Sequence, residues 1–486
     1  MPNRDSDGSS GETSYQYRVG RSRNFLSRLQ KATRFGLVAP RTCITDLPSV
    51  HRATFVVQNG QKDRVALPLS LSWSNLNEEI EPMDSPEAAP GSSVRGHSNE
   101  TALLAAVISA IVIAQVTFNL LPMYIGALTE QLNLSPDRAG FVGSVDMGCL
   151  AISAMLVSPV LHRVSLRLLA GSAAVIALSA HLSSMAIENY NVLLIARGVA
   201  GIASGILYAA GSAALARVSD PERAYAKMMI GGMVPAALMS VIAPFAITRW
   251  GVAGVFGTMA LTAFLGLYLL KYIPSNSVKP AAGNREREEN QRPVLLRGSS
   301  LILMTTNFMM LMSFGGLWAF SEQIGLSTGL GRETFGGIIA ASAAISATGS
   351  LLAAWLGTRF GRIRPLLGAI LLTGLFSLGM TLSTGPLEFT ALLLLWSIGW
   401  SFTAPYFMGA GATLDPTGRL VAAMGGMGMI GVATGPTLGG WLLERGGLPT
   451  IGFAIVAITL TLTSLLFPVL RGIEKTNTTS QTEYPS

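Results

Sequence analysis

Residues 271–297, KYIPSNSVKPAAGNREREENQRPVLLR, form a hydrophilic stretch with six basic residues near the middle of a chain of 486 residues. On both sides of it the sequence is almost continuously apolar, over residues 101–270 and over residues 299–470. Each apolar block is long enough for six helices of about 20 residues, the length that crosses a bilayer. The sequence therefore predicts two six-helix bundles joined by a basic linker.

The composition is that of a membrane protein. Half of the residues are hydrophobic, only 13% are charged, and the mean hydropathy is +0.47, whereas soluble domains carry about 25% charged residues. The basic residues lie mainly in the N-terminal region and between the apolar runs, so the net charge of +7 indicates loops beside anionic lipid rather than a nucleic-acid surface. Two cysteines and four histidines predict neither a disulfide framework nor a metal site.

The apolar blocks divide into twelve predicted spans, and the fold class is an all-α membrane protein with twelve transmembrane helices. The spans are expected near residues 101–128, 139–161, 168–187, 191–216, 228–248 and 251–273, and near residues 299–325, 334–357, 365–384, 388–412, 420–442 and 447–470. The corresponding domains are a first bundle at 101–273, a linker at 274–298, a second bundle at 299–470 and a tail at 471–486.

Basic residues in the loops predict the orientation. With the amino terminus in the cytoplasm, the inner loops carry fifteen Lys and Arg residues and the outer loops carry four, namely Arg138, Arg249, Arg332 and Arg445. The positive-inside rule then places both termini and the central linker in the cytoplasm. We expect a multi-pass protein of the plasma membrane, the inner membrane if the source is bacterial.

Residues 1–99 are polar, rich in Ser and Arg, and without a sustained structural period. They predict a disordered extension or a misassigned start, with Met83 as the alternative first residue; a functional domain is the remaining possibility. The stretch also resembles an organelle transit peptide, but the early acids Asp5, Asp7 and Glu12 argue against this.

The two halves share an internal repeat. Asp220-Pro221 and Asp415-Pro416 lie 195 residues apart, and each pair is followed by Gly-Gly-Met, at residues 231–233 and 425–427. Pro244 and Pro436 then fall at matching depths. Repetition within a twelve-helix chain is typical of transporters, in which one half moves against the other around a site between them.

Two turns predicted to be cytoplasmic carry a family pattern, G-x-L-x-D-R-x-G-R-R. The first reads Ser158-Pro-Val-Leu-His-Arg163-Val-Ser-Leu-Arg167, and the second reads Leu356-Gly-Thr-Arg359-Phe-Gly361-Arg362. The chain thus resembles the major facilitator superfamily, which implies transport by alternating access, a monomer, and gating at these turns. His162 and Thr358 stand where the family has its acid, so the charge relay attributed to the turn lacks that acid in both copies. The alternative is a purely positive-inside anchor.

Arg197 begins a sequence with spaced glycines, Arg197-Gly-Val-Ala-Gly201-Ile-Ala-Ser-Gly205, which resembles the family's fourth-helix pattern. A charge within a span normally faces a partner or a wet cavity. Glycines four residues apart allow a neighbouring helix to approach closely. A snorkelling arginine near the helix end is the alternative.

Asp146 and Glu322 are the two acids predicted to lie within the spans near Arg197. A carboxylate whose exposure alternates can load and release a proton. We predict that Asp146 couples transport to protons, with Arg197 either tuning it or receiving an anionic substrate. A static ion pair between two helices is the alternative. Glu322 is the second candidate, unless it lies at the water interface.

Gly431-Val-Ala-Thr-Gly435-Pro436-Thr-Leu-Gly439-Gly440 matches a pattern that exporters of the family carry in the fifth helix, although here it lies in the eleventh. Glycines permit close backbone contact and proline removes a hydrogen bond. The motif therefore predicts a kinked, closely packed helix and gives only slight support for export.

Family cavities are lined by the first, fourth, seventh and tenth helices. Polar and aromatic residues on these spans are candidates for the substrate cavity: Gln115, Asn119, Tyr208, Trp318, Trp400 and Tyr406. A cavity with several rings and few charges suits a moderately apolar organic solute. Each ring taken alone is more often at the lipid interface than in a binding site.

The chain carries no phosphate-binding loop, zinc motif or catalytic arrangement, so we expect neither an enzyme nor a cofactor. The predicted function is proton-coupled secondary transport of a small organic molecule. Export of a hydrophobic or drug-like compound is slightly favoured. Uptake of an organic acid and a transporter-like receptor that binds without translocating are the alternatives.

Overall fold

The computed structural model describes residues 53–58, 64–69, 92–161, 163–215, 221–275, 295–357, 359–415 and 418–482. Most of the N-terminal region, Met83, His162, Thr358, the central part of the linker and the last four residues of the predicted tail lie outside the described residues. The chain divides into two units, residues 1–93 and residues 94–486. Each unit is described by itself.

The described residues of the first unit include one pair of strands. β1 (Ala53–Gln58) and β2 (Arg64–Leu69) pair antiparallel, with Ala53 opposite Leu69. The sequence predicted no regular structure here. The Val, Phe and Thr residues of these strands favour extended backbone, but six residues are too few for a sustained period to stand out.

The second unit contains the helices, and twelve of those in the described residues are long and apolar enough to cross a membrane, as predicted. In the first half the helices are α3 (Ser92–Asn119), α4 (Leu121–Gln131), α5 (Pro136–Val157), α6 (Leu166–Ser184), α7 (Tyr190–Leu215), α8 (Pro221–Trp250) and α9 (Val252–Leu267), with 3₁₀ turns at Ser158–Val160 and Leu269–Tyr272. Of these, the short helix α4 is not one of the twelve spans. In the second half they are α11 (Gly298–Ser327), α12 (Arg332–Leu356), α13 (Ile363–Leu382), α14 (Pro386–Leu414), α15 (Arg419–Gly446) and α16 (Leu448–Thr482).

Two predicted boundaries differ from the structure. The first span, expected as one helix over residues 101–128, is interrupted at Leu120 and continues as α4, which has a proline in its first turn. Proline lacks the N–H of a helical hydrogen bond, so a new helix begins there. The last span was expected to end at residue 470, but α16 continues through Pro468 and past this residue to Thr482.

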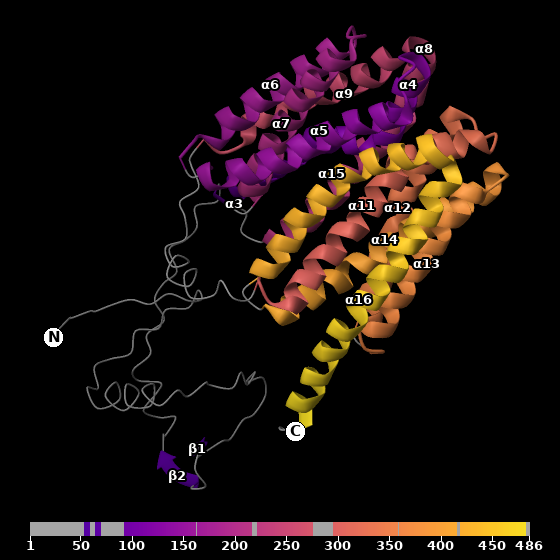
Figure 1. The fold of residues 1–486 in the computed structure, drawn as a ribbon. Coiled ribbons are helices and arrows are strands. Elements are labelled where there is room, and N and C mark those ends of the chain that lie inside the picture. The colour runs from indigo at the N-terminus through magenta and orange to yellow at the C-terminus, as the bar shows by residue number, and fades with distance from the viewer. Residues whose placement is uncertain are drawn as a thin grey trace, which may run out of the picture. The chain divides into compact units, whose positions relative to one another are not determined.

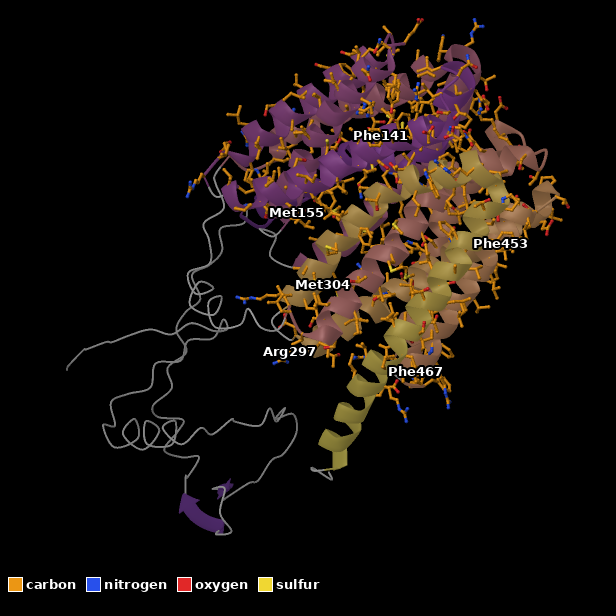
Figure 2. All side chains as sticks on the ribbon, viewed as in Figure 1. Phe141, Met155, Arg297, Met304, Phe453 and Phe467 are labelled. Carbon is orange, nitrogen blue, oxygen red and sulfur yellow. The ribbon has the colours of Figure 1, made fainter. Side chains whose placement is uncertain are left out.

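The helices pack as two bundles that match the two halves of the sequence (Figure 1). In the first bundle α5 packs on α7 and α6 packs on both α7 and α9, whereas in the second α11 packs on α15, α12 on α14 and α13 on α16. Large apolar side chains cover the outside of the bundles; Phe453 and Phe467 project from α16 and are 57% and 46% exposed (Figure 2). Such surfaces are expected where a helix faces lipid.

The two prolines of the sequence repeat lie at equivalent contacts between the halves. Pro244 of α8 packs against Gly336, the fifth residue of α12, and Pro436 of α15 packs against Gly140, the fifth residue of α5. A Cβ atom at either glycine would collide with backbone of the opposite half. The repeat thus gives the two halves matching contact surfaces, one on each side of the interface.

Polar contacts between the halves gather at one end of the bundles. They include hydrogen bonds from Trp318 Nε1 to the Phe118 carbonyl (2.9 Å), from Gln323 to Thr129 (3.1 Å), from the Thr437 amide to Ser144 (3.0 Å) and from Arg332 to Glu130 (2.6 Å). We call this the closed end. At the opposite end, from which the linker leaves, the ribbons of the two halves diverge (Figure 1).

Close helix packing in the first half should depend on Gly205 of α7. A Cβ atom there would collide with the carbonyl of Leu150 and with Ser153 on α5. We expect Gly205→Ala to destabilise the bundle by about 1–3 kcal/mol, the usual cost of overpacking. The measurement is the thermal unfolding midpoint of the purified protein in detergent.

Gly171 on α6 provides the matched control, because a Cβ atom there would meet nothing within 4 Å. Gly171→Ala should be neutral or stabilise the helix by up to about 1 kcal/mol. Equal midpoints for the two variants would contradict the packing role of Gly205.

The ion pair between Arg332 and Glu130 should help to hold the closed end together. Arg332 is 17% and Glu130 49% exposed, and a pair in such a position contributes about 0.2–1 kcal/mol. Glu130→Gln removes this ion pair. It should raise the fraction of molecules in which the two halves are separated at this end by up to about fivefold. Spin labels at Glu188→Cys and Ser327→Cys, in a background with Cys43→Ser and Cys149→Ser, would report the separation as a distance distribution.

Glu333 is the control, since it lies next to Arg332 and forms no ion pair within the described residues. Glu333→Gln removes the same charge and should leave the distance distribution as it is. If both variants broadened the distance distribution equally, the loss of a negative charge, and not the loss of the ion pair, would be responsible.

Candidate functional site

A buried ion pair occupies the interior of the first half. Arg197 of α7 donates to the same carboxylate oxygen of Asp146 on α5 from Nε (2.9 Å) and from Nη2 (2.6 Å). Neither side chain is exposed. A charge removed from water at this depth is stable only with a partner and further hydrogen bonds, so the pairing predicted from the sequence is a strong constraint on the packing.

The remaining donors of Arg197 are also used. Nη1 lies 3.2 Å from His181 Nδ1 and 3.4 Å from the Ser184 hydroxyl, both on α6, and Nη2 lies 3.4 Å from the Thr117 hydroxyl on α3. The guanidinium has five N–H groups, and each has a partner here. Because Nδ1 of His181 faces a donor, this ring is neutral and carries its proton on Nε2.

Two aromatic rings complete the surroundings of Arg197. The guanidinium carbon lies 5.0 Å from the centre of the Phe256 ring on α9 and 5.8 Å from that of Tyr124 on α4, within reach of a cation–π attraction. The cluster therefore joins α3, α4, α5, α6, α7 and α9. In this state Arg197 is enclosed within the first half and offers no free donor to a ligand between the halves.

Each of the two predicted proton carriers has one oxygen without a protein partner. Asp146 Oδ1 is buried and unpaired among the described residues, and so is Glu322 Oε2. Glu322 on α11 is fully buried rather than at the water interface, and its other oxygen accepts from Arg332 Nε at 3.0 Å. Arg332 also reaches Glu130, so Glu322 belongs to the polar network at the closed end.

Five aromatic rings meet where the two halves face each other. Phe314 stacks on Trp396 with ring centres 4.9 Å apart and on Trp400 at 4.2 Å. Phe118 of the first half lies 6.1 Å from Phe314 and 6.2 Å from Trp318. We call these five residues the aromatic cluster; it combines α3 from one half with α11 and α14 from the other.

Two amides lie on the same helix as Phe118 of the aromatic cluster. Gln115 and Asn119 lie one turn apart on α3, and Phe118 is three residues after Gln115 and directly before Asn119. Both amides are half-buried, and within the described residues neither has a hydrogen-bond partner. Of the predicted cavity residues, Trp318 and Trp400 both stack on Phe314 in this cluster, and the placement of Gln115 and Asn119 in a substrate cavity stays a prediction.

The two predicted tyrosines lie elsewhere. Tyr406 packs in the core of the second half, with its hydroxyl donating to the Gly357 carbonyl at 2.8 Å. Tyr208 is half-buried against the core of the first half at its open end. Sequence position placed both on cavity-lining helices but could not give the direction of their side chains.

The basic turns lie at the open end and are tied to neighbouring helices. Arg167 Nε donates to the Ile273 carbonyl at 2.8 Å, and the guanidinium of Arg359 lies 5.7 Å from the centre of the Trp355 ring. Arg163 has its own interactions within the described residues. Gly361 adopts a φ of +74°, a conformation that glycine tolerates best.

An acid that the sequence motif lacks is supplied from another helix. Glu474 of α16 accepts hydrogen bonds from the backbone N–H groups of Arg362 (2.6 Å) and Ile363 (3.1 Å) at the start of α13. The guanidinium of Arg362 reaches the Thr413 hydroxyl at 2.5 Å. A carboxylate at a helix N-terminus is stabilising, so Glu474 holds the second turn in place.

The glycine motif of α15 lies along two neighbouring helices. Gly431 and Gly435 face backbone atoms of α11, and Gly439 faces Gly316 and the Phe320 ring of the same helix. Gly440 faces the Pro136 carbonyl of α5. Pro436 faces α5 as well, so the motif packs α15 on its own half and on the other half at once.

An apolar cavity of about 660 Å³ lies between α5 and α15. Figure 2 shows Phe141 on the edge of α5 that faces α15, and this side chain is 44% exposed. Within the described residues no group of three or more His, Cys, Asp or Glu side chains could hold a metal ion.

Several site residues were missed from the sequence. His181, Ser184 and Thr117 come from apolar helices in which a single polar residue carries no special signal. Phe118, Phe314 and Trp396 were missed because aromatic residues are common in membrane spans. Phe314 lies four residues before Trp318 and Trp396 lies four residues before Trp400, which was the available hint for these two.

Comparisons with known proteins agree with this architecture. The family model of the Major Facilitator Superfamily matches residues 106–425. The gentisate transporter of Corynebacterium glutamicum is 26% identical over 376 residues, which cover 72% of this chain and 83% of that protein.

Solved structures share the fold. A variant of the nucleoside transporter NupG aligns with a TM-score of 0.65 at 11% identity, over 76% of this chain and 99% of that one. A POT family transporter in complex with a thioalcohol-conjugated peptide aligns with a TM-score of 0.61 at 14% identity, over 76% and 96%. Since the family model covers more than half of the chain, the protein belongs to the Major Facilitator Superfamily and is a multi-pass secondary transporter.

Proposed function

We propose that the protein is a proton-coupled transporter of a small aromatic organic acid, which it moves by alternating access. The observation that carries this proposal is the aromatic cluster. Its rings come from both halves and pack face to face at the interface. Stacked rings present apolar, polarizable faces that bind another planar ring, a contact that adds about 0.5–1.5 kcal/mol to area burial.

The acid group of the substrate requires hydrogen-bond donors near the rings. Arg197 does not supply them, because all five of its N–H groups are engaged inside the first half. The amides of Gln115 and Asn119 are unpaired within the described residues and flank Phe118. Each amide carries two N–H donors, so together they can hold a carboxylate while the ring rests on the cluster.

The named relative supports the same substrate class. It is called a gentisate transporter, and gentisate is a dihydroxybenzoate, a ring with a carboxylate. Of the two substrate classes predicted from the sequence, the name of this relative favours an organic acid over a drug-like compound. The direction of transport stays a prediction, and so does the alternative of a receptor that binds without translocating.

With both termini in the cytoplasm, as the basic loops predict, the closed end faces outward and the structure is an inward-facing state. The outward-facing state then requires the contacts of Trp318, Gln323 and Arg332 with the first half to break. A plasma-membrane location is proposed together with this orientation.

Proton coupling is proposed through Asp146, with Glu322 as the second candidate. Both carboxylates are buried, and each keeps one oxygen free of protein partners, which is where a proton could be carried. Movement of the halves would alter their exposure to water. The static alternative, in which the Asp146–Arg197 pair only fixes helices, is tested below.

Trp400 should contribute directly to substrate affinity. We expect Trp400→Leu to raise the KM for benzoate or gentisate by about 2- to 12-fold, because one stacked ring face is lost. The measurement is transport by proteoliposomes containing the purified protein. Trp355→Leu is the control, since Trp355 is 66% exposed and outside the cluster, and its KM should not change.

The same assay separates transport from binding alone. Solute accumulation that follows an imposed pH gradient would establish translocation and its direction. Saturable binding without accumulation would instead support the receptor alternative. If neither aromatic acid binds or moves, the proposed substrate class is wrong.

Asp146→Asn distinguishes a proton carrier from a static pair. If Asp146 carries the proton, the variant should lose accumulation driven by a pH gradient by about tenfold or more but retain exchange of labelled for unlabelled solute. A static pair predicts that the two activities fall together, with a lower unfolding temperature. Retention of both activities would move the coupling role to Glu322, tested with Glu322→Gln.

A further inference from the structure

A small cavity lies inside the second half, directly behind the aromatic cluster. Its volume is about 30 Å³, and Phe314, Trp396 and Trp400 form one side of it. The other side is formed by α13 and α16 and includes Thr373, Ser377 and Thr459. A cavity of about 10–15 Å³ by this measure holds one water molecule, whereas one that binds benzene has about 150 Å³, so this cavity accommodates hydroxyl-sized groups and not a ring.

The hydroxyl groups of Thr373, Ser377 and Thr459 each donate their hydrogen to a backbone carbonyl. Thr373 donates to the Ala369 carbonyl at 2.7 Å, Ser377 to the Thr373 carbonyl at 2.8 Å and Thr459 to the Val456 carbonyl at 2.9 Å. A hydroxyl has one hydrogen and two lone pairs. Once the hydrogen is donated to the helix backbone, the oxygen is left as an acceptor, so the cavity offers lone pairs and no free hydroxyl hydrogen from these residues.

Two glycines allow these hydroxyls to come close to the rings. A Cβ atom at Gly374 would stand 2.5 Å from Thr459 Oγ1, and one at Gly399 would stand 2.5 Å from Thr373 Oγ1. Both distances are too short for real contacts. The three hydroxyl residues are themselves buried, with exposed fractions of 9% or less, so the acceptors are fixed in position and shielded from bulk water.

Phe314 separates this cavity from the interface between the halves. Its ring touches both Trp396 and Trp400 and is half-buried, and it also contacts Phe118 and Trp318. A substrate ring that took the place of Phe314 against the two indoles would have its edge next to the cavity. A substituent on that edge would then meet Thr373 and Thr459.

We propose that this cavity selects aromatic acids that carry a hydroxyl group on the ring. The hydroxyl donates into the acceptors of Thr373, Ser377 and Thr459, while the carboxylate stays at Gln115 and Asn119. A carboxylate is disfavoured in the cavity, because it is larger than the space and would set its own lone pairs against those of the hydroxyls. This inference rests on the proposed transport of aromatic acids and adds the group that distinguishes one such acid from another.

The test compares benzoate with 3-hydroxybenzoate and 4-hydroxybenzoate in proteoliposomes. The wild-type protein should transport one of the hydroxylated acids with a kcat/KM higher than that for benzoate by about three- to tenfold, the usual effect of one neutral hydrogen bond. Thr459→Val and Thr373→Val remove an acceptor with little change of shape. In both variants the ratio of kcat/KM for the hydroxylated acid to kcat/KM for benzoate should fall toward one.

Thr461→Val is the matched control. Thr461 lies two residues beyond Thr459 on α16, is exposed on the outer face of the helix and donates to its own backbone in the same way. This variant should keep the wild-type preference. Gel filtration would confirm that all three variants remain folded and monodisperse.

The possible outcomes separate the two proposals. An unchanged preference in both Thr459→Val and Thr373→Val, equal losses for benzoate and the hydroxylated acids, or a wild-type protein with no preference would overturn the selection by this cavity and leave the proposed function intact. A wild-type protein that transports none of the three acids would overturn both.

Discussion

A guanidinium in the middle of a helical bundle needs hydrogen-bond partners for its five N–H groups, and this requirement governs the first half of the protein. Arg197 meets it with Asp146, His181, Ser184 and Thr117. Breaking a buried charge pair by removing one partner typically costs 3–5 kcal/mol. Because the partners lie on α3, α5 and α6, these helices cannot move separately from α7 without that cost. The hydrogen bonds of Arg197 therefore tie these four helices together.

The second half is organised by apolar contact and small residues instead of a central charge. Glycines on α15 bring it against α11 and against α5 of the other half. Rings from α11 and α14 occupy the position next to the interface. The two halves thus differ in their chemistry. The first is held together by a buried ion pair, and the second presents aromatic rings and hydroxyl groups. Such a division suits a transporter in which one half serves as the frame and the other presents most of the substrate contacts.

Much of the fold was predictable because membrane spans carry a strong signal. Hydropathy predicted the twelve helices, because in lipid every span must be long, apolar and helical. The offset of 194 to 195 residues predicted the repeat. Asp146 and Arg197 were predictable as a pair because few charges lie within the spans. The break at Leu120 was not predicted, because a proline near a helix start and one within a helix look alike in sequence.

The proposed substrate site was only partly predictable, because its residues lie far apart along the chain. Phe118 and Trp318 are 200 residues apart, and their contact follows from how two bundles meet rather than from any local pattern. Tyr406 was on the expected helix but faces its own core. Glu474 supplies a carboxylate that the motif near Thr358 lacks, although it belongs to α16. Local patterns identified the helices, but pairing between them decided which side chains share a site.

The matching contacts of Pro244 and Pro436 show why the closed end is the more tightly joined end of the two halves. Each proline packs against a glycine at the fifth residue of a helix in the opposite half, so the two contacts lie at equal depth on opposite sides of the interface. Both glycines lie in the first turns of their helices, and the hydrogen bond between Thr437 and Ser144 lies one turn further along α5. Close backbone contact and the polar contacts of Arg332 and Gln323 therefore act at the same end. Under the proposed alternating access, both sets of contacts would have to separate before this end could open.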